Sequence, residues 1–136
     1  MFPTFRSAVC ICAALIPFHL TYVEPTVSAV AQESDVVTVK MTAEHKFLPE
    51  KITIQVGQTV EWVNVEEGGI HQVTTDQDVA ADPADVSIPE GAEPFDSHLI
   101  KTGKSFRHQF TVPGVYKYAC PPHESAGMIG EMAVKK

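Results

Sequence analysis

The sequence predicts an all-β protein, a Greek-key antiparallel β-sandwich of about seven or eight strands. From Asp35 onward, short β-branched and apolar runs alternate with glycine and proline turns, and no stretch repeats its apolar residues with a helical period. One long acidic segment interrupts the runs, as the long connection of a Greek key does. A chain of 136 residues is enough for one domain, which we expect at residues 32–136.

The strands follow from the alternation of apolar and polar residues between turn signals. In one run, Ile52 and Ile54 point to the same face, and in the next run Val60 and Trp62 do so. Gly57 marks the tight turn between these two runs. We expect strands at residues 36–41, 51–56, 59–64, 70–74, 105–112, 115–119 and 129–134.

The acidic loop, residues 76–96, lacks a sustained period and contains three prolines. Residues 86–88 fit a short edge strand within it. Loops of this length are usually functional or mobile. Its carboxylates are interpreted as a solvated face, and a docking surface is the alternative.

Residues 1–31 have the features of a secretory signal peptide. A single cation, Arg6, precedes a short apolar run, and small residues surround the cleavage site expected after Ala31. A membrane anchor is the rival interpretation, but Pro17 and His19 interrupt a run that is already too short to span a bilayer. We therefore expect export without stable membrane insertion. The periplasm is favoured over a thylakoid lumen or the extracellular space, because the signal has no twin arginine.

The net charge and the cysteine content limit the possible partners and the possible roles of the thiol. The formal net charge of −7 disfavours nucleic acid as a partner and favours a basic protein. Of the three cysteines, Cys10 and Cys12 lie in the expected signal, so the exported domain keeps only Cys120. A lone exported thiol pairs with another chain, stays buried and inert, or binds a metal as thiolate.

The strongest chemical signal is one loop between two expected strands, Cys120-Pro121-Pro122-His123-Glu124-Ser125-Ala126-Gly127-Met128. Its prolines and glycine allow the chain to curl, so that a thiol, an imidazole and a thioether converge. His71, upstream, lies on a strand that a sandwich can place beside this loop. Two imidazoles, a thiolate and a thioether are the donor set of blue-copper electron-transfer sites, whereas a thioether is abnormal for structural zinc. Each residue alone is more often structural, but their joint spacing predicts that His71, Cys120, His123 and Met128 bind one copper ion.

A longer pattern surrounds these ligands and extends over residues 36–134. It comprises Phe47-x-Pro49-x-x-Ile52-x-Ile54-x-x-Gly57-x-Thr59-Val60-x-Trp62-x-Asn64, His71, Phe95-Asp96-Ser97, Gly103-x-x-Phe106-x-x-x-Phe110, Pro113-Gly114-x-Tyr116-x-Tyr118-x-Cys120-x-Pro122-His123 and Gly127-Met128-x-Gly130. This pattern closely resembles the cupredoxins, the type 1 blue copper proteins. Within that family the ligand spacing is similar to plastocyanin and pseudoazurin, whereas in amicyanin the thioether follows the histidine one residue sooner.

The resemblance implies a role for each ligand. His71 becomes the buried imidazole, and Cys120 the thiolate that carries most of the electronic coupling. His123 becomes the imidazole with a solvent-exposed edge, and Met128 the weak axial ligand.

Three neighbours of the ligands bear on the reduction potential. Gln72 stands where the family usually has Asn, so its backbone amide is expected to bond the sulfur, while the side-chain tie between the ligand loops is left open by this substitution. Pro121 replaces a common Ser or Thr. Pro122 matches the family and has no N–H to donate to the sulfur, so we expect a moderately high potential.

The resemblance further implies a monomeric one-electron carrier rather than an enzyme. Its partners would be redox proteins such as a c-type cytochrome or an oxidase or reductase, with a basic docking face. The electron would leave through the edge of His123, inside an apolar rim of Gly69, Ile70, Pro121, Pro122, Ala126 and Gly127. A copper-binding carrier or storage protein is the alternative.

The remaining histidines do not indicate further copper centres. A copper enzyme needs additional histidine ligands, and the chain has no His-x-His pair. His45, His98 and His108 have no partners at ligand spacing and are interpreted as surface or half-buried imidazoles.

Overall fold

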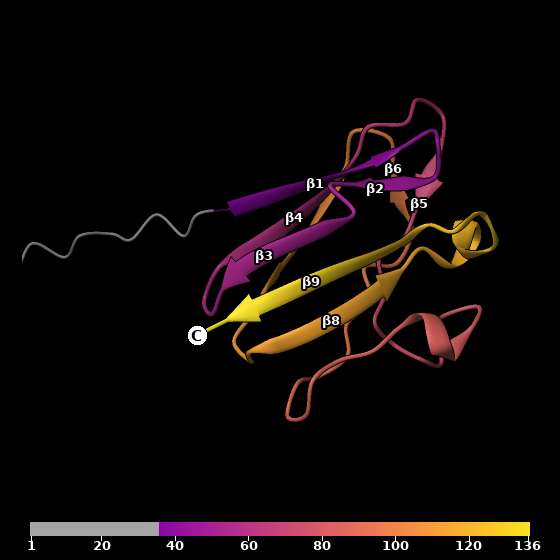
Figure 1. Ribbon diagram of the computed structural model, residues 1–136. Coiled ribbons are helices and arrows are strands. Elements are labelled where there is room, and N and C mark those ends of the chain that lie inside the picture. Colours follow the sequence, from indigo (N-terminus) through magenta and orange to yellow (C-terminus); the bar gives the residue numbers. More distant parts are fainter. Residues whose placement is uncertain (1–35) are drawn as a thin grey trace, which may run out of the picture. The chain divides into compact units, whose positions relative to one another are not determined.

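The computed structural model describes residues 36–136, which form a β-sandwich (Figure 1). One sheet has the strand order β2-β1-β4-β7, the second has the order β3-β9-β8, and β5 pairs with β6. The strands are β1 (Val36–Thr42), β2 (Lys46–Leu48), β3 (Lys51–Gln55), β4 (Thr59–Asn64), β5 (Ile70–His71), β6 (Ile100–Lys101), β7 (Ser105–Gln109), β8 (Gly114–Ala119) and β9 (Ile129–Lys135). The signal peptide expected at residues 1–31 lies outside the described residues.

The all-β fold class is confirmed, with two differences from the expected sandwich. Strand pairing is mixed rather than purely antiparallel, because β1 pairs with β4 and β3 pairs with β9 in parallel. The physical reason is that β3 belongs to the opposite sheet, so the chain crosses between the layers before it returns beside β1. The second difference is the presence of β2 and β6, which have three and two residues and are too short to show a period.

The core lies between the two sheets and follows the predicted alternation. In β4, Val60 and Trp62 are fully buried, and the ring of Trp62 lies 5.4 Å from that of Tyr118 on the opposite sheet. Ile54 is buried as expected, whereas Val56 lies beyond the end of β3 and is exposed. The hydrophobic cluster also includes Cys120, so the predicted metal site is continuous with the core.

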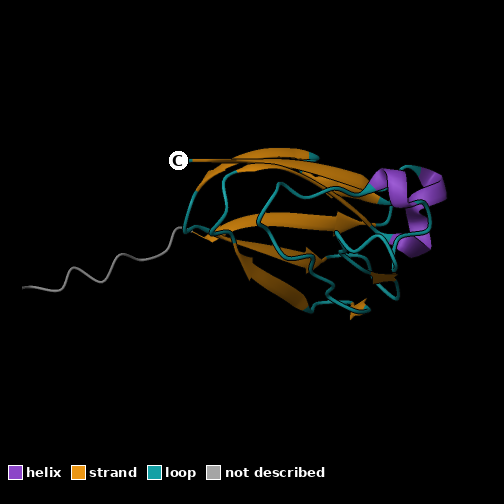
Figure 2. Ribbon diagram, turned by 90° about the horizontal axis from the view of Figure 1, so that it is seen from below, coloured by secondary structure: helices purple, strands orange, loops and turns teal. Residues whose placement is uncertain are grey.

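Two 3₁₀ segments lie at the same end of the sandwich, away from the C-terminus (Figure 2). They are η1 (Pro83–Asp85), in the acidic loop, and η2 (Pro121–Ala126), between β8 and β9. The edge strand expected at residues 86–88 is not formed as a strand, but Ser87 makes a single antiparallel bridge to Lys117 of β8. Within residues 36–136, no helix is long and apolar enough to cross a membrane.

Candidate metal centre

The loop after β8 is held closed by its own backbone. The N–H of Cys120 donates to the carbonyl of Met128 at 3.0 Å, and the N–H of His123 donates to the carbonyl of Cys120 at 2.8 Å. Gly127 ends η2 at φ 78°, a left-handed conformation that favours glycine. These bonds bring the two ends of the loop together and turn His123 back towards Cys120.

A short antiparallel strand pair, whose two strands are far apart in the sequence, carries His71 to the same site. His71 ends β5, which pairs with β6 in the register His71 to Ile100. Asn64, buried at the end of β4, donates to the carbonyls of Gly69 at 3.1 Å and Ile100 at 2.8 Å. One buried amide therefore hydrogen-bonds the segments of both strands. These bonds hold the strands in place, because leaving the buried amide unpaired would be costly.

Three of the predicted ligands converge. The Cys120 sulfur lies 3.8 Å from Nδ1 of His71 and 3.5 Å from Nδ1 of His123. The donor atoms of all three residues lie within 4.8 Å of one another. Bond lengths of about 2.0 to 2.3 Å around one ion would place such donors about 3.5 Å apart. The spacing therefore fits a single metal ion bound by all three side chains.

The protonation of these groups also fits a metal ion. Burial raises the pKa of the Cys120 thiol to about 11, although the N–H groups of Gln72 and His123 oppose this rise. Burial also lowers the pKa of His71 and of His123, so both imidazoles favour the neutral, metal-binding form. A thiol in this environment ionises when a bound cation replaces its proton.

The fourth predicted ligand, Met128, is fully buried at the end of the same loop. Its N–H donates to the carbonyl of His123 at 3.3 Å, while its carbonyl accepts from Cys120. The thioether thus belongs to a segment whose backbone is bonded to two of the other proposed ligands. A buried thioether in the same loop as the thiol would suit copper better than zinc.

The outer side of His71 meets a carboxylate. Oε2 of Glu66 lies 2.8 Å from Nε2 of His71, and neither atom hydrogen-bonds another described group. After burial, Glu66 is the largest influence on the pKa of His71, which it raises. A Cβ atom on Gly69 would overlap the Glu66 carboxyl group, so glycine at this position leaves room for the contact. A carboxylate on the outer nitrogen of a metal-binding imidazole fixes its tautomer and orientation.

The outer side of His123 meets another imidazole. The rings of His45 and His123 are stacked with centroids 4.0 Å apart and planes 8° apart. His45 has a φ of 54°, which is uncommon outside glycine and carries its side chain to this position. His45 is partly buried, in agreement with its interpretation as a surface or half-buried imidazole, but its stack on a proposed ligand was not predicted. No spacing rule connects it to the ligand loop, because the contact arises from packing between distant segments.

The sulfur accepts a hydrogen bond from the chain, as predicted. The backbone N–H of Gln72 donates to the Cys120 sulfur at 3.3 Å. The side-chain Nε2 of Gln72 donates to Oδ1 of Asp96 at 2.7 Å. The question left open by the substitution at position 72 is thus answered, since the side chain is tied to the end of the acidic loop.

Glu124 connects the ligand loop to the acidic loop. Its side chain is buried, and its two carboxylate oxygens accept from the N–H groups of Ala81 at 2.9 Å and Asp82 at 2.7 Å. Both carboxylate oxygens are thereby satisfied within the protein. The sequence analysis gave Glu124 no role, and an acid within a ligand loop signals such a contact only once the fold is known.

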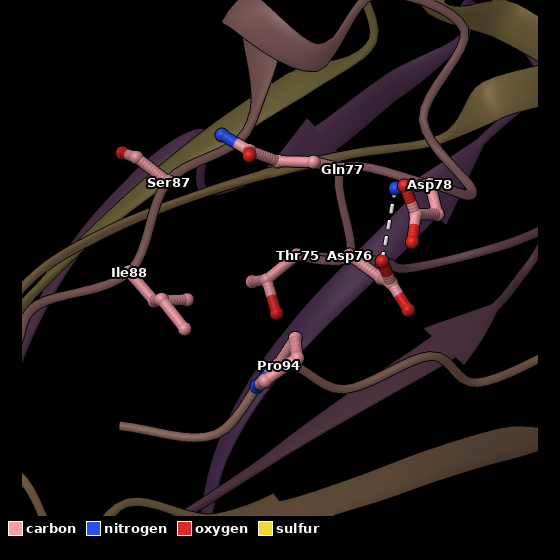
Figure 3. Close-up of a pocket in the computed structure, with 7 residues that line it drawn as sticks. All are labelled: Thr75, Asp76, Gln77, Asp78, Ser87, Ile88 and Pro94. Carbon is pink, nitrogen blue, oxygen red and sulfur yellow. Dashed lines mark hydrogen bonds between the residues drawn. The ribbon is translucent and has the colours of Figure 1, made fainter. Parts of the chain in front are cut away.

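A separate hollow lies along the acidic loop. It has a volume of about 350 Å³ and is lined by Thr75, Asp76, Gln77, Asp78, Ser87, Ile88 and Pro94 (Figure 3). One hydrogen bond joins two of these lining residues, from the N–H of Asp78 to Oδ1 of Asp76 at 2.9 Å (Figure 3). None of the proposed ligands lines this hollow.

The sequence was compared with protein-family models. The model of the copper binding proteins of the plastocyanin/azurin family matches residues 33–135. This chain belongs to that family. Copper is the metal of these cupredoxins, and the thiol and two imidazoles that converge in this structure are donors that suit such an ion.

Similar sequences are plastocyanins. The plastocyanin of Scenedesmus fuscus is 35% identical over 106 residues, which cover 73% of this chain and 99% of that protein. The chloroplastic plastocyanin of Chlamydomonas reinhardtii is 36% identical over 105 residues, which cover 72% of this chain and 66% of that protein. These identities support the predicted similarity to plastocyanin.

Solved structures agree on the cupredoxin fold. A reduced amicyanin matches with a TM-score of 0.56 and 26% identity, over 74% of this chain and 83% of that chain. A copper-containing nitrite reductase from Thermus scotoductus matches with a TM-score of 0.57 and 33% identity, over 74% of this chain but 22% of that chain. The second likeness therefore covers one part of a larger protein.

Proposed function

We propose that this cupredoxin is an exported one-electron carrier that holds one type 1 copper ion through His71, Cys120, His123 and Met128. The observation that carries the proposal is the position of the Cys120 sulfur, which faces Nδ1 of both imidazoles while only His123 among these residues is partly exposed. Because the other three proposed ligands are buried, a partner would reach the metal through His123.

When bound, copper supplies a centre that gains and loses one electron as it changes between Cu(I) and Cu(II). The protein holds its donor groups in nearly fixed positions. The two ends of the ligand loop are hydrogen-bonded through the N–H of Cys120 and the carbonyl of Met128, and Asn64 bonds the segments of β5 and β6. Because the donors are fixed and three of them are fully buried, little protein or water has to reorganise when an electron arrives.

The edge of His123 is the proposed exit for the electron. The apolar rim expected around it includes Ile70, which is 42% exposed. Leu99, next to β6 and 56% exposed, adds apolar surface near β5. Weak electron-transfer encounters use small interfaces, so an apolar rim of this kind is sufficient for docking.

Charge supports a basic redox partner, such as a c-type cytochrome or an oxidase or reductase. The net charge of −7 favours steering towards a positive surface. Several carboxylates of the acidic loop are exposed, and Glu124 ties this loop to the ligand loop. We propose the acidic loop as the steering surface. The dependence of the electron-transfer rate on ionic strength tests this role, since steering weakens with salt.

Export is proposed from residues 1–31, with the periplasm as the compartment and a thylakoid lumen as the alternative. The plastocyanin of Chlamydomonas reinhardtii is named chloroplastic, which keeps the alternative in view. The mass of the protein recovered from its native compartment tests the cleavage. A mature chain that begins at Gln32 is expected, and retention of residues 1–31 would contradict it.

One visible spectrum tests the electron carrier. Copper-loaded protein is expected to show an intense thiolate-to-copper band that ascorbate removes and a mild oxidant restores. The absence of the band, or a failure to cycle, would overturn the proposal.

Transfer of copper to an acceptor chelator distinguishes a copper carrier or storage protein. Such a protein gives up its ion, whereas an electron carrier keeps it through many turnovers. Metal analysis is expected to find one copper per chain, without the further centre that a copper enzyme needs.

A further inference from the structure

The side chain of Gln72 connects the sulfur environment to the surface. Its backbone N–H donates to the Cys120 sulfur at 3.3 Å, and its Nε2 donates to Oδ1 of Asp96 at 2.7 Å. The other carboxylate oxygen of Asp96, Oδ2, accepts from the backbone N–H of His98 at 3.2 Å and lies 2.9 Å from Nδ1 of its ring. One carboxylate thus holds Gln72 on its inner side and His98 on its outer side.

Asp96 itself is firmly placed. The N–H of Ser97 donates to the carbonyl of Val73 at 3.0 Å, and the N–H of Thr75 donates to the carbonyl of Phe95 at 3.0 Å. These bonds run on both sides of Asp96 and lock its segment against the strand end that follows His71. The Asp96 side chain is 15% exposed, whereas that of His98 is 90% exposed. The inner contact is therefore better shielded from water than the outer contact.

Gln72 needs such an anchor. Its side chain is long and loses considerable rotamer freedom when it is fixed, so its position depends on the partner at its end. Pro121, which follows Cys120 in the chain, has neither a hydroxyl nor an N–H that could hydrogen-bond the Gln72 side chain. The Asp96 carboxylate accepts a charge-assisted hydrogen bond from this amide, and such a bond is stronger than a neutral one.

We propose that Asp96 is a positioning residue of the metal centre, which holds Gln72 so that its backbone N–H stays on the Cys120 sulfur and sets the reduction potential. The inference rests on the proposed function, since it requires a redox-active metal on that sulfur. An N–H donor withdraws charge from the thiolate and stabilises the reduced state, which has more negative charge. Loss of the anchor therefore lowers the potential.

The test separates the anchor from the charge of Asp96. Asp96→Asn and Asp96→Leu both remove the negative charge, but only Asn retains an oxygen for Gln72. We expect the potential of Asp96→Leu to lie below that of Asp96→Asn. Gln72→Met removes the side-chain donor at nearly constant length, and in that background the two Asp96 variants should have the same potential. His98→Ala is the matched control, which removes the exposed contact and leaves the difference in place.

A measurement without copper separates this inference from the proposed function. In the metal-free protein, the amide hydrogen of Gln72 should exchange roughly tenfold faster in Asp96→Leu than in Asp96→Asn. Wild-type protein that lacks the copper band or does not cycle refutes the electron carrier, whatever the exchange rates are.

Two results overturn the anchor itself. One is equal potentials for Asp96→Leu and Asp96→Asn, and the other is a difference that persists unchanged beside Gln72→Met. If Asp96→Leu does not fold, Gln72→Met alone decides, because an unchanged potential in that variant refutes the role of the side chain.

Discussion

His71 and His123 both place Nδ1 near the Cys120 sulfur, at 3.8 and 3.5 Å, but the protein supports them differently. His71 is fully buried and meets the Glu66 carboxylate on its outer nitrogen. His123 is partly exposed and stacks on the ring of His45. One imidazole is anchored by charge within the protein, and the other is packed against a neighbour at the surface.

This difference separates two tasks of an electron-transfer site. The donors must not move when the charge of the metal changes, and the site must still come within reach of a partner. The His71 side meets the first requirement because this imidazole is fully buried and its outer nitrogen lies against the Glu66 carboxylate. The His123 side meets the second because stacking restrains the ring while its edge stays accessible. The variants below test whether this division of tasks is correct.

Removal of either imidazole should give the largest contrast. In the metal-free protein, His71→Ala leaves a buried cavity and an unpartnered Glu66, so the free energy of unfolding should fall by about 2 to 4 kcal/mol. His123→Ala should lower it by less than about 1 kcal/mol, because the ring is partly exposed. Urea unfolding measures both values.

A second readout uses free imidazole with copper. Imidazole should enter the gap in His123→Ala and restore a visible copper band, whereas it cannot reach the buried gap in His71→Ala. Equal destabilisation of the two variants, or rescue of both, would contradict the division between an anchored and an accessible side.

The Glu66 contact should have the next largest effect. Glu66→Leu leaves the outer nitrogen of His71 without a partner and should weaken copper binding about 10- to 100-fold, as measured by competition with a chelator. Gly69→Ala should act in the same direction, because its Cβ displaces the Glu66 side chain. Glu67→Leu is the control, since Glu67 is exposed and has no contact with His71 among the described interactions. Similar losses in Glu66→Leu and Glu67→Leu would show that only net charge matters.

The convergence of His71, Cys120 and His123 could be predicted from the sequence, whereas the groups that contact them could not. Cys120, His123 and Met128 share one short loop, so their spacing along the chain determines their spacing in space. Glu66, Asp96 and His45 reach the site from separate segments, and each contact depends on how the two sheets and the acidic loop pack. A single sequence records no such juxtaposition.

The fold shows the same distinction between local and distant information. The alternation in β4 predicted that Val60 and Trp62 share a face, because strand geometry is local. Parallel pairing of β1 with β4 depends on which sheet receives β3, and that is decided by packing across the sandwich. The two-residue β5 was expected to extend to residue 74, but the chain there turns to pair with Asp96 and Ala119 through isolated bridges.

The stack of His45 on His123 should have a smaller effect. His45→Ala removes the stacked ring, and His45→Phe retains one, while both side chains carry the same backbone strain at φ 54°. The difference between the two variants therefore isolates stacking, and it should amount to about 0.5 to 1 kcal/mol in the free energy of unfolding. Ring motion of His123, measured by NMR relaxation of the metal-free protein, should increase in the Ala variant alone. Equal ring motion in both variants would mean that His45 does not restrain the ligand.

Substitution of His108 should have the smallest effect. It tests how burial changes the pKa of a histidine that is not a proposed metal ligand. Its ring stacks on Phe95 with centroids 4.4 Å apart, and burial alone lowers its pKa. The unfolded chain therefore takes up a proton as the pH falls below about 6.5, before the folded protein does. Since the unfolded state then binds more protons, the free energy of unfolding decreases as the pH falls through this window, and it levels off below the folded pKa.

His108→Phe keeps a ring against Phe95 and should lose this part of the acid sensitivity, so its stability relative to the wild type should rise as the pH falls. If His108→Phe follows the wild-type profile, burial does not set the protonation of this ring, and the same argument would weaken for the His71 side of the metal centre.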